Sequence, residues 1–310
     1  MIPWADADEV GELAAVAEEC GWDGIFVWEP VWGVDAWVSL ALAAVRTSKI
    51  RLGTMLTPPS RRRPAELASQ VATVDRLSDG RVTLSVGLGA VDTGMDAFGE
   101  ECDKRTRAEL MDECLDVVCG LWQGQPFEYS GKHHQIRPTE FPTIGNTVQK
   151  PRVPIWCVGV LGRQRSMQRA LGWDGLIPQV IDEDGARQAH LDELAAVTEQ
   201  LPGGNYDVII EGAWAEHSPA AWADAGATWW LETQWDAVGQ ARPGLAIMDH
   251  LRDGPPNLRI TATANYGARR DHYGLELRRR LRTDRRSDPR RTRAATRRPR
   301  HHLVRVRHPR

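Results

Sequence analysis

The sequence predicts an α/β fold of the TIM (β/α)8-barrel type, and two observations carry this prediction. Short apolar runs that are typical of buried strands alternate with amphipathic helical runs from about Gly21 to about Asp236. Strands that are apolar on both faces and separated by helices indicate a parallel sheet. Seven or eight such units fall within roughly 250 residues, which favours a closed barrel over an open sheet.

Seven segments are predicted to be strands because they are short, rich in branched and aromatic residues, and bounded by turn-forming residues. They cover residues 23–29, 50–57, 81–89, 154–159, 173–178, 206–212 and 227–232. A barrel needs one further strand before the first helix, where the sequence offers only residues 1–4. We therefore expect this chain to lack the first barrel strand, either because the true start lies upstream or because the barrel is incomplete.

Helices are predicted between these strands because apolar residues recur there every three or four positions. The first runs from Asp8 to Cys20 and stops at Gly21, a residue typical of helix C-termini. The others cover residues 35–47, 64–77, 104–122, 163–171, 183–200, a short segment from 218, and 245–252. Ser218 followed by Pro219 is typical of an N-cap and a first helical position.

Residues 124–152 lack either periodicity and are too long for an ordinary helix-to-strand connection. Long excursions of this kind often carry function, so we interpret this one as a candidate lid. It contains His133 and His134, but adjacent residues of an extended chain point in opposite directions and no carboxylate has ligand spacing. We therefore predict no metal site.

Charge divides the chain into an acidic body and a basic tail. Residues 1–257 hold 21 Lys and Arg against 38 Asp and Glu, whereas residues 258–310 hold 18 against 4. We expect 1–257 to form the barrel domain and 258–310 to be a disordered arginine-rich tail, because the tail cannot bury a core. The tail is either a basic arm that binds nucleic acid or non-native sequence from a frameshift, and the abrupt change after Pro256 favours the second.

Other features of the sequence indicate the cellular compartment and exclude some classes of protein. The five cysteines lack CxxC spacing, no segment resembles a signal peptide, and no run approaches 18 apolar residues. We expect reduced thiols in a cytoplasmic protein with no membrane partner. The sequence has no GxGxxG, P-loop lysine or GxSxG motif, which argues against a dinucleotide-binding module, an NTPase and an α/β-hydrolase.

Several blocks, taken in order, resemble the bacterial luciferase-like flavin- or deazaflavin-dependent oxidoreductases. The blocks are residues 20–29, 50–58, 61–64, 72–89, 151–159, 173–175 and 226–232, and the resemblance covers about residues 3–257. It implies a TIM barrel and an oxidoreductase in which the cofactor performs the chemistry. Reduced FMN with oxygen, acting as a monooxygenase on a small organic substrate, is the leading expectation. Hydride transfer with a deazaflavin coenzyme is the alternative.

This chain differs from the family pattern in two places, and two other classes of function stay open. The family's first strand, which helps to wall the cofactor pocket, is missing, and Val158–Gly159 stands where the family often has two glycines. A barrel hydrolase or isomerase without flavin and an inactive truncated paralogue with a nucleic-acid-binding tail stay possible readings. A flavin reductase and a second copy of the chain are the candidate protein partners that the resemblance implies.

The candidate site residues follow the strands, because barrel sites form at the carboxyl ends of strands. Glu29 is the candidate catalytic residue: the resemblance implies positioning or proton transfer, and an apolar aromatic wall would raise its pKa. Thr54 and Thr57 are predicted to contact the cofactor ring, as that segment does in the family. Gly87 and Gly89 permit close approach of the backbone to a flat ligand, although tight packing is the other reading.

The remaining candidates are one phosphate site and two substrate contacts. Gly159, Gly162 and Arg163 lie between a strand and a helix, where backbone N–H groups at a helix N-terminus suit the cofactor phosphate. Trp32 could stack on a planar ligand, and Arg61 could clamp an anion, so both are predicted substrate contacts. A solvated basic loop is the alternative for Arg61. Glu211 and Glu232 also end strands and either face the site or cap loops.

Overall fold

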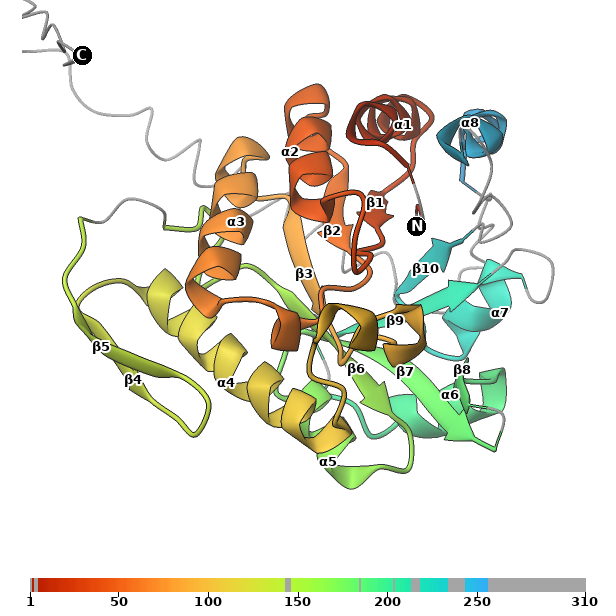
Figure 1. The fold of residues 1–310 in the computed structure, drawn as a ribbon. Helices are drawn as coiled ribbons and strands as arrows, with labels where there is room; N and C mark the ends of the chain where they lie inside the picture. The colour runs from red at the N-terminus through yellow and green to blue at the C-terminus, as the bar shows by residue number, and fades with distance from the viewer. Residues whose placement is uncertain are drawn as a thin grey trace, which may run out of the picture. The chain divides into compact units, whose positions relative to one another are not determined.

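The computed structural model describes residues 2, 5–142, 146–183, 185–202, 204–212, 218–233 and 243–255. The chain divides into one unit of Met1–Arg259 and another of Ile260–Arg310. The second unit and the whole of the tail predicted from residue 258 lie outside the described residues. In the first unit, helices cover the outer side of a curved sheet (Figure 1).

The main path of the sheet is a row of parallel strands in the order β1-β2-β3-β6-β7-β9-β10. These strands are β1 (Gly24–Val27), β2 (Arg51–Thr54), β3 (Val82–Val86), β6 (Ile155–Val160), β7 (Gly175–Asp182), β9 (Asp207–Gly212) and β10 (Trp229–Glu232). All seven predicted strands are confirmed. The two ends of the row approach each other, because the rings of Phe26 on β1 and Trp229 on β10 are 6.2 Å apart. The described strands therefore form a nearly closed barrel of the TIM type.

Ile2 marks the place of an eighth strand beside β1. Its N–H donates to the carbonyl of Phe26 at 2.7 Å, and its carbonyl accepts from the N–H of Trp28 at 3.0 Å. This is a single parallel bridge between Ile2 and Val27. The bridge lies within the segment 1–4 where the end of a first strand was expected, of which only residue 2 is among the described residues.

Eight α-helices lie in the described ranges, and most match their predictions. They are α1 (Ala7–Glu19), α2 (Ala36–Arg46), α3 (Pro64–Leu77), α4 (Lys104–Gln123), α5 (Gln164–Leu171), α6 (Leu191–Thr198), α7 (Pro219–Asp224) and α8 (Pro243–Asp253). Gly21 takes a left-handed φ of 88° after α1, and the Asp35 carboxylate caps α2. None of these helices combines the length and apolar character that crossing a bilayer requires.

Two segments differ from the prediction. The predicted helix 183–200 is only α6, because residues before it form β8 (Gly185–Gln188), which pairs antiparallel with β7. The excursion 124–152 contains a hairpin of β4 (Phe127–Ser130) and β5 (Gln135–Thr139). No residue of β4, β5 or β8 is buried, so these strands lack the apolar runs by which the sequence marks the strands of the barrel.

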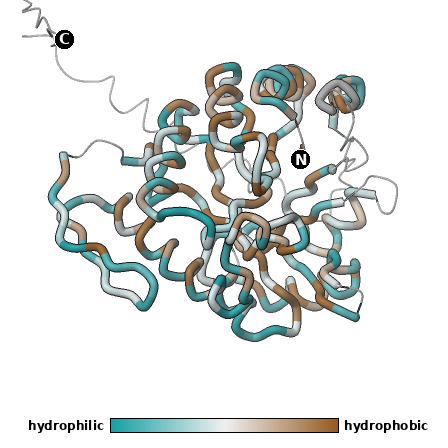
Figure 2. Tube along the Cα trace, in the orientation of Figure 1, coloured by the Kyte–Doolittle hydropathy of each residue, from teal (hydrophilic) through white to brown (hydrophobic). Residues whose placement is uncertain are grey.

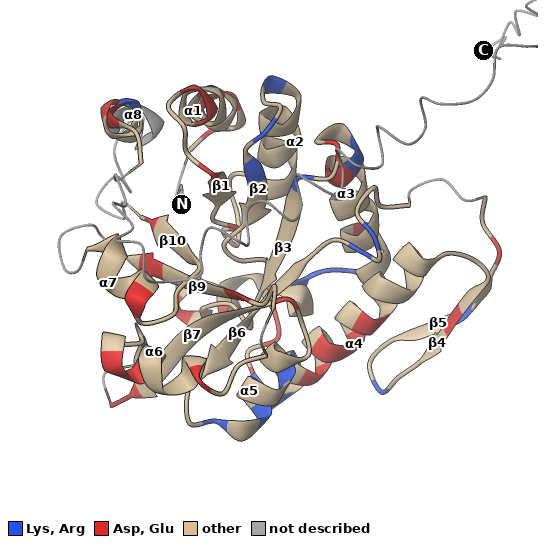
Figure 3. Cartoon of the chain, turned by 180° about the vertical axis from the view of Figure 1, so that it is seen from behind, with Lys and Arg blue, Asp and Glu red and all other residues tan. Residues whose placement is uncertain are grey.

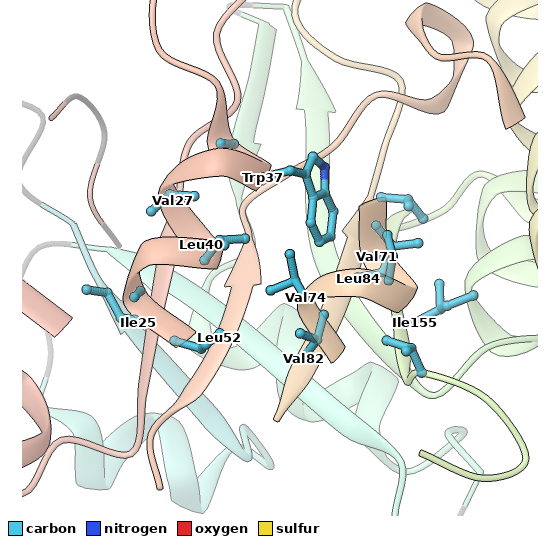
Figure 4. Close-up of a cluster of buried hydrophobic side chains, with 14 of the residues drawn as sticks. Ile25, Val27, Trp37, Leu40, Leu52, Val71, Val74, Val82, Leu84 and Ile155 are labelled. Carbon is cyan, nitrogen blue, oxygen red and sulfur yellow. The ribbon is translucent and has the colours of Figure 1, made fainter. Parts of the chain in front are cut away.

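One apolar layer packs between the helices and the outer face of the sheet. Val27, Leu52 and Leu84 point outward from β1, β2 and β3 and pack in the same cluster as Trp37 of α2 and Val71 of α3 (Figure 4). Figure 2 shows hydrophobic and hydrophilic residues alternating along the helices, as expected for helices with one apolar face. Each such side chain contributes about 1.5–3 kcal/mol on full burial, so this layer is the main source of stability.

A second cluster fills the interior of the barrel with aromatic side chains. The ring of Phe26 stacks on Trp156 with centroids 5.1 Å apart, and Trp229 lies 5.3 Å from Trp156. Gly53 and Gly175 make room for these rings, since a Cβ at Gly53 would lie 2.5 Å from the Phe26 ring and a Cβ at Gly175 2.5 Å from Trp156. The barrel interior is therefore packed, and a ligand site is confined to the C-terminal rim.

Glu18 ties the end of α1 to the turn between α2 and β2. Its carboxylate accepts N–H donors from Ser48 at 2.9 Å, Lys49 at 2.5 Å and Ile50 at 2.8 Å. Burial by itself raises the pKa of Glu18, but these backbone donors outweigh it and lower the pKa to about 2. The ionised carboxylate is thus the form that holds this turn.

Replacing Glu18 by glutamine (Glu18→Gln) is expected to lower the free energy of unfolding by about 1–2 kcal/mol at pH 7, because charge-assisted bonds are lost. Since folding lowers the pKa, the contribution is full above the ordinary value of 4.5 and is lost as the pH falls towards about 2. Urea unfolding at pH 7 and pH 3 measures it. Glu19→Gln, at an exposed neighbour, is the matched control and should have little effect at either pH.

Gly53→Ala is expected to destabilise the protein by about 1–3 kcal/mol, because the added Cβ overlaps the Phe26 ring and the Thr83 carbonyl inside a packed barrel. Gly212→Ala is the control within a strand, since its Cβ would meet its nearest neighbour at 3.3 Å. Thermal unfolding of both variants decides the point. Equal melting temperatures would show that the interior is not tightly packed around Phe26.

Candidate functional site

The structure places Glu29 in a buried polar cluster at the C-terminal rim. Glu29 follows β1, and its side chain is only 2% exposed. Its Oε2 accepts the hydroxyl of Thr57 at 2.7 Å, and its Oε1 accepts Nε of Arg62 at 2.9 Å. Nη2 of Arg62 lies 2.7 Å from the same Oε1. The candidate carboxyl is therefore held on both oxygens rather than solvated.

The last residue of β2, Thr54, and the segment after the strand, with Thr57, bring both predicted threonines to this cluster. Thr57 Oγ1 lies 2.9 Å from Thr54 Oγ1, and Thr54 Oγ1 lies 3.4 Å from the carbonyl of Ser85. Both threonines are fully buried. The chain turns between them through a cis peptide bond at Met55–Leu56. The sequence predicted cofactor contacts for both threonines. In the structure Thr57 contacts Glu29 and Thr54 contacts Thr57, and the contact with a cofactor stays a prediction.

The environment of Glu29 shifts its pKa above that of a free carboxyl. Burial raises the pKa of Glu29, and the charge of Arg62 and the hydroxyl of Thr57 offset part of that rise. Arg61 contributes a further positive charge from the same segment. A buried carboxyl with a raised pKa at a barrel rim is typical of a group that holds and releases a proton.

Arg62 is the residue of this cluster that sequence reasoning missed. The sequence offers three consecutive arginines, and the prediction selected Arg61. In the structure Arg61 lies in η1 (Pro59–Arg61), and its guanidinium donates to the carbonyls of Pro30 and Val31 and pairs with Glu100. Arg62 comes directly after η1 and points to Glu29. Only the path of this turn decides which guanidinium reaches the carboxylate.

The glycines after β3 are packed against protein groups. A Cβ at Gly87 would lie 2.8 Å from Leu56 and 2.9 Å from Val158, so the space that Gly87 leaves is filled by these side chains. Gly89 takes a left-handed φ of 75°. Nη1 of the buried Arg107 holds the carbonyl of Gly89 at 3.0 Å. The tight-packing reading accounts for Gly87, and a role for either glycine in ligand binding stays a prediction.

The predicted phosphate site lies at the start of α5, away from the Glu29 cluster in the sequence. A Cβ at Gly159 would clash with Leu176 and meet Met167 at 3.0 Å, so this glycine permits close packing under α5, and its role in cofactor binding stays a prediction. Gly162 has a φ of 74° and open space around it. Arg163 is the N-cap of α5 and gives it no side-chain hydrogen bond. Figure 3 shows basic residues on α5 and acidic residues along α4.

The other candidates lie apart from the Glu29 cluster. Trp32 follows β1 on the loop before α2 and is 75% exposed, so its role as a substrate contact stays a prediction. Glu232 pairs with His250 of α8 at 2.9 Å, on the outer side of the sheet. Glu211 ends β9. The structure therefore joins Glu29, Thr54 and Thr57, and it does not join Trp32 or Glu232 to them.

The tip of the β4–β5 hairpin is bound to α4 through carboxylates that sequence reasoning did not pair with it. The carboxylate of Glu113 accepts the N–H groups of Lys132, His133 and His134 at 2.7–2.8 Å. Nε2 of His133 lies 3.0 Å from the carboxylate of Glu109. The candidate lid is thus fastened to α4 at its tip. Within the described residues no group of three or more His, Cys, Asp or Glu residues could hold a metal ion.

Comparison with protein families gives one match that covers nearly the whole chain. A family model described as luciferase-like monooxygenase matches residues 3–304. Alignments with three curated relatives cover 38–49% of this chain and 32–52% of the relatives' own length. The alignments with these relatives therefore span about half of their length or less.

The names of the relatives and of the solved structures mention two kinds of cofactor, coenzyme F420 and FMN. The F420-dependent glucose-6-phosphate dehydrogenase of Amycolatopsis mediterranei is 31% identical over 43% of this chain and 41% of its own length. The coenzyme F420-dependent tetrahydromethanopterin reductase of Methanopyrus kandleri is similar in structure (TM-score 0.56, 22% identity, 68% of this chain and 65% of that one). A type II Baeyer–Villiger monooxygenase of Pseudomonas putida, in complex with FMN, is similar in fold (TM-score 0.54, 18% identity, 67% and 62%).

Arg62→Met is expected to destabilise the protein by about 3–5 kcal/mol at pH 7, because it leaves the buried Glu29 carboxylate without its cation. Folding already raises the pKa of Glu29, and losing Arg62 raises it further. The loss should therefore grow as the pH rises above the ordinary carboxyl range and shrink in acid. Urea unfolding between pH 4 and pH 8 measures this dependence.

The control places Arg62→Met in a Glu29→Gln background, where no carboxylate needs compensation. There the loss should be smaller and nearly independent of pH. Equal losses in both backgrounds at every pH would show that the ion pair does not govern the stability of the rim.

Proposed function

This chain belongs to the luciferase-like monooxygenase family, and from that premise we propose that it is an oxidoreductase that moves hydride between coenzyme F420 and a small organic substrate. The observation that carries the proposal is the Glu29–Thr57–Thr54 cluster, a buried proton-holding group at the C-terminal rim. Barrel enzymes place their chemistry at this rim. Hydride transfer to or from a carbonyl or alcohol also needs a group that takes or supplies a proton.

The residues at the rim fit a planar redox cofactor by two tests. The hydroxyl oxygen of Ser85 on β3 is buried and has no hydrogen-bond partner within the described residues. By strand alternation Ser85 faces the barrel interior, beside the segment of Thr54 and Thr57. The first turn of α5 has no side-chain cap, and Gly162 leaves open space beside it. Such a helix start suits a phosphate group.

Each part of the rim has a role in this proposal. Ser85 and Thr57 would hold the edge of the cofactor ring, while the start of α5 with Arg163 would hold its phosphate. The bound deazaflavin would supply or accept the hydride. Glu29 would hold a proton at Oε2 and exchange it with the substrate oxygen, and Arg62 would keep Glu29 Oε1 in place. Trp32 would cover the substrate and help to exclude water.

The ordering of the two cofactors rests on the named relatives. Relatives with more than 30% identity include enzymes that are named for coenzyme F420, which supports the deazaflavin proposal. Monooxygenation with reduced FMN and oxygen is the second candidate, supported by the name of the family model. A flavin reductase is a partner only in the second case. A second copy of the chain as a partner is a proposal for both.

Binding of coenzyme F420 and of FMN to the full-length protein, followed by fluorescence, tests the function directly. We expect tight binding of F420 and transfer of hydride to a carbonyl or from an alcohol. Arg163→Gln should weaken binding by about tenfold, because a charge-assisted bond to phosphate is lost. Arg137→Gln on the exposed hairpin strand β5 is the matched control and should bind as the parent does.

Binding of FMN alone, with oxygen consumption on reduction, would replace the first candidate by the second. Failure to bind either cofactor would overturn both and return the chain to the class of flavin-independent barrel proteins.

A further inference from the structure

The oxygens of the rim cluster form one continuous chain that is almost entirely shielded from solvent, with only Glu29 retaining a small exposed fraction. Glu29 Oε2 contacts Thr57 Oγ1 at 2.7 Å, Thr57 Oγ1 contacts Thr54 Oγ1 at 2.9 Å, and Thr54 Oγ1 faces the Ser85 carbonyl at 3.4 Å. Glu29 is 5% exposed and both threonines are fully buried. Every proton in this chain must therefore find its acceptor within the protein.

The proton count of a hydroxyl restricts how these contacts can be donated. Thr57 has one hydroxyl proton, so it donates either to Glu29 or to Thr54, and it accepts from the other. Oε1 of Glu29 already faces two N–H donors of Arg62. A proton on Glu29 therefore resides on Oε2, the oxygen that contacts Thr57.

Two complete arrangements follow, one for each charge state of Glu29. When Glu29 is ionised, Thr57 donates to Oε2 and Thr54 donates to Thr57. When Oε2 is protonated, Glu29 donates to Thr57, Thr57 donates to Thr54, and Thr54 donates to the carbonyl of Ser85. Both arrangements leave every buried hydroxyl proton with an acceptor, so neither charge state carries the penalty of an unsatisfied group.

We propose that Thr57 and Thr54 form a reversible hydroxyl relay that lets Glu29 gain or lose a proton inside the closed rim. When Glu29 loses its proton, the O–H bond at Oε2 breaks and an O–H bond forms on the substrate oxygen or on a water molecule. The reverse exchange occurs when Glu29 gains a proton. The threonine protons rotate about their C–O bonds and stay on their own oxygens. The threonines are thus positioning residues, whose role in catalysis rests on the proposed function of Glu29.

The charged groups around the relay are the same in both arrangements. Arg62 contacts Glu29 directly, and Arg61 adds positive charge from the preceding residue while its own guanidinium is held by Glu100. Burial raises the pKa of Glu29 against both arginines. The threonine hydroxyls are the part of this environment that reorients when Glu29 changes its charge.

The relay predicts opposite effects for two similar substitutions. Thr57→Val removes the partner of Oε2 in both charge states. Because a hydrogen bond to the ionised carboxylate is stronger than one from the neutral carboxyl, the ionised form loses more, and the titration midpoint of Glu29 should rise by about one pH unit. Thr54→Val removes the acceptor that Thr57 needs when Glu29 is protonated, so the midpoint should fall by about one pH unit. The measurement is the pH titration of the Glu29 carboxyl signal by NMR in ¹³C-glutamate-labelled full-length protein, with Glu29→Gln assigning the signal.

Thr57→Ser and Thr54→Ser keep the hydroxyls and should restore the parent midpoint, which a purely space-filling role of the methyl groups would not do. Shifts of the same sign for both valine variants, or no shift for Thr54→Val, would overturn the relay. The titration needs no cofactor, so failure of the relay is separate from failure to bind F420 or FMN. Unfolding curves of the serine variants confirm that the rim is folded.

Discussion

The structure depends on how the curved parallel sheet fills its own interior. Phe26, Trp156 and Trp229 come from β1, β6 and β10, and their rings meet inside the barrel. Two glycines on the strands leave the space that these rings need. Interiors are packed as densely as organic crystals, so this plug leaves little freedom to the strands that carry it. It joins the two ends of the sheet and confines ligand chemistry to the rim.

At the rim, two neighbouring arginines bind different partners. The guanidinium of Arg61 donates hydrogen bonds to the backbone of the loop after β1 and pairs with Glu100. These contacts fix the position of that loop. Arg62 turns inward and compensates Glu29. A buried carboxylate is tolerated only with such a partner and with further hydrogen bonds. The loop that positions the carboxyl and the cation that neutralises it are therefore set by one short turn.

Helix α4 supports the same rim from the outside. Its buried Arg107 donates to the carbonyls of Leu88 and Gly89, directly after β3. Further along the same helix, Glu109 and Glu113 hold the tip of the β4–β5 hairpin. The long excursion is thereby joined to the helix that fixes the strand end. Such support from neighbouring elements keeps the groups of a site in place before a ligand binds.

The sequence by itself determined the barrel, because strands buried on both faces are continuous apolar runs, which can be recognised without knowing which strands pair. It also located Glu29, Thr54 and Thr57, since position after a strand places a residue at the rim whatever its neighbours are. It could not decide between Arg61 and Arg62, or show that Gly159 serves packing, because both depend on contacts between residues far apart in the chain. The β4–β5 hairpin and β8 were hidden for the same reason: their short strands exist through pairing and through bonds to α4 and β7. Local pattern sets which elements form, and only tertiary packing decides which side chains meet.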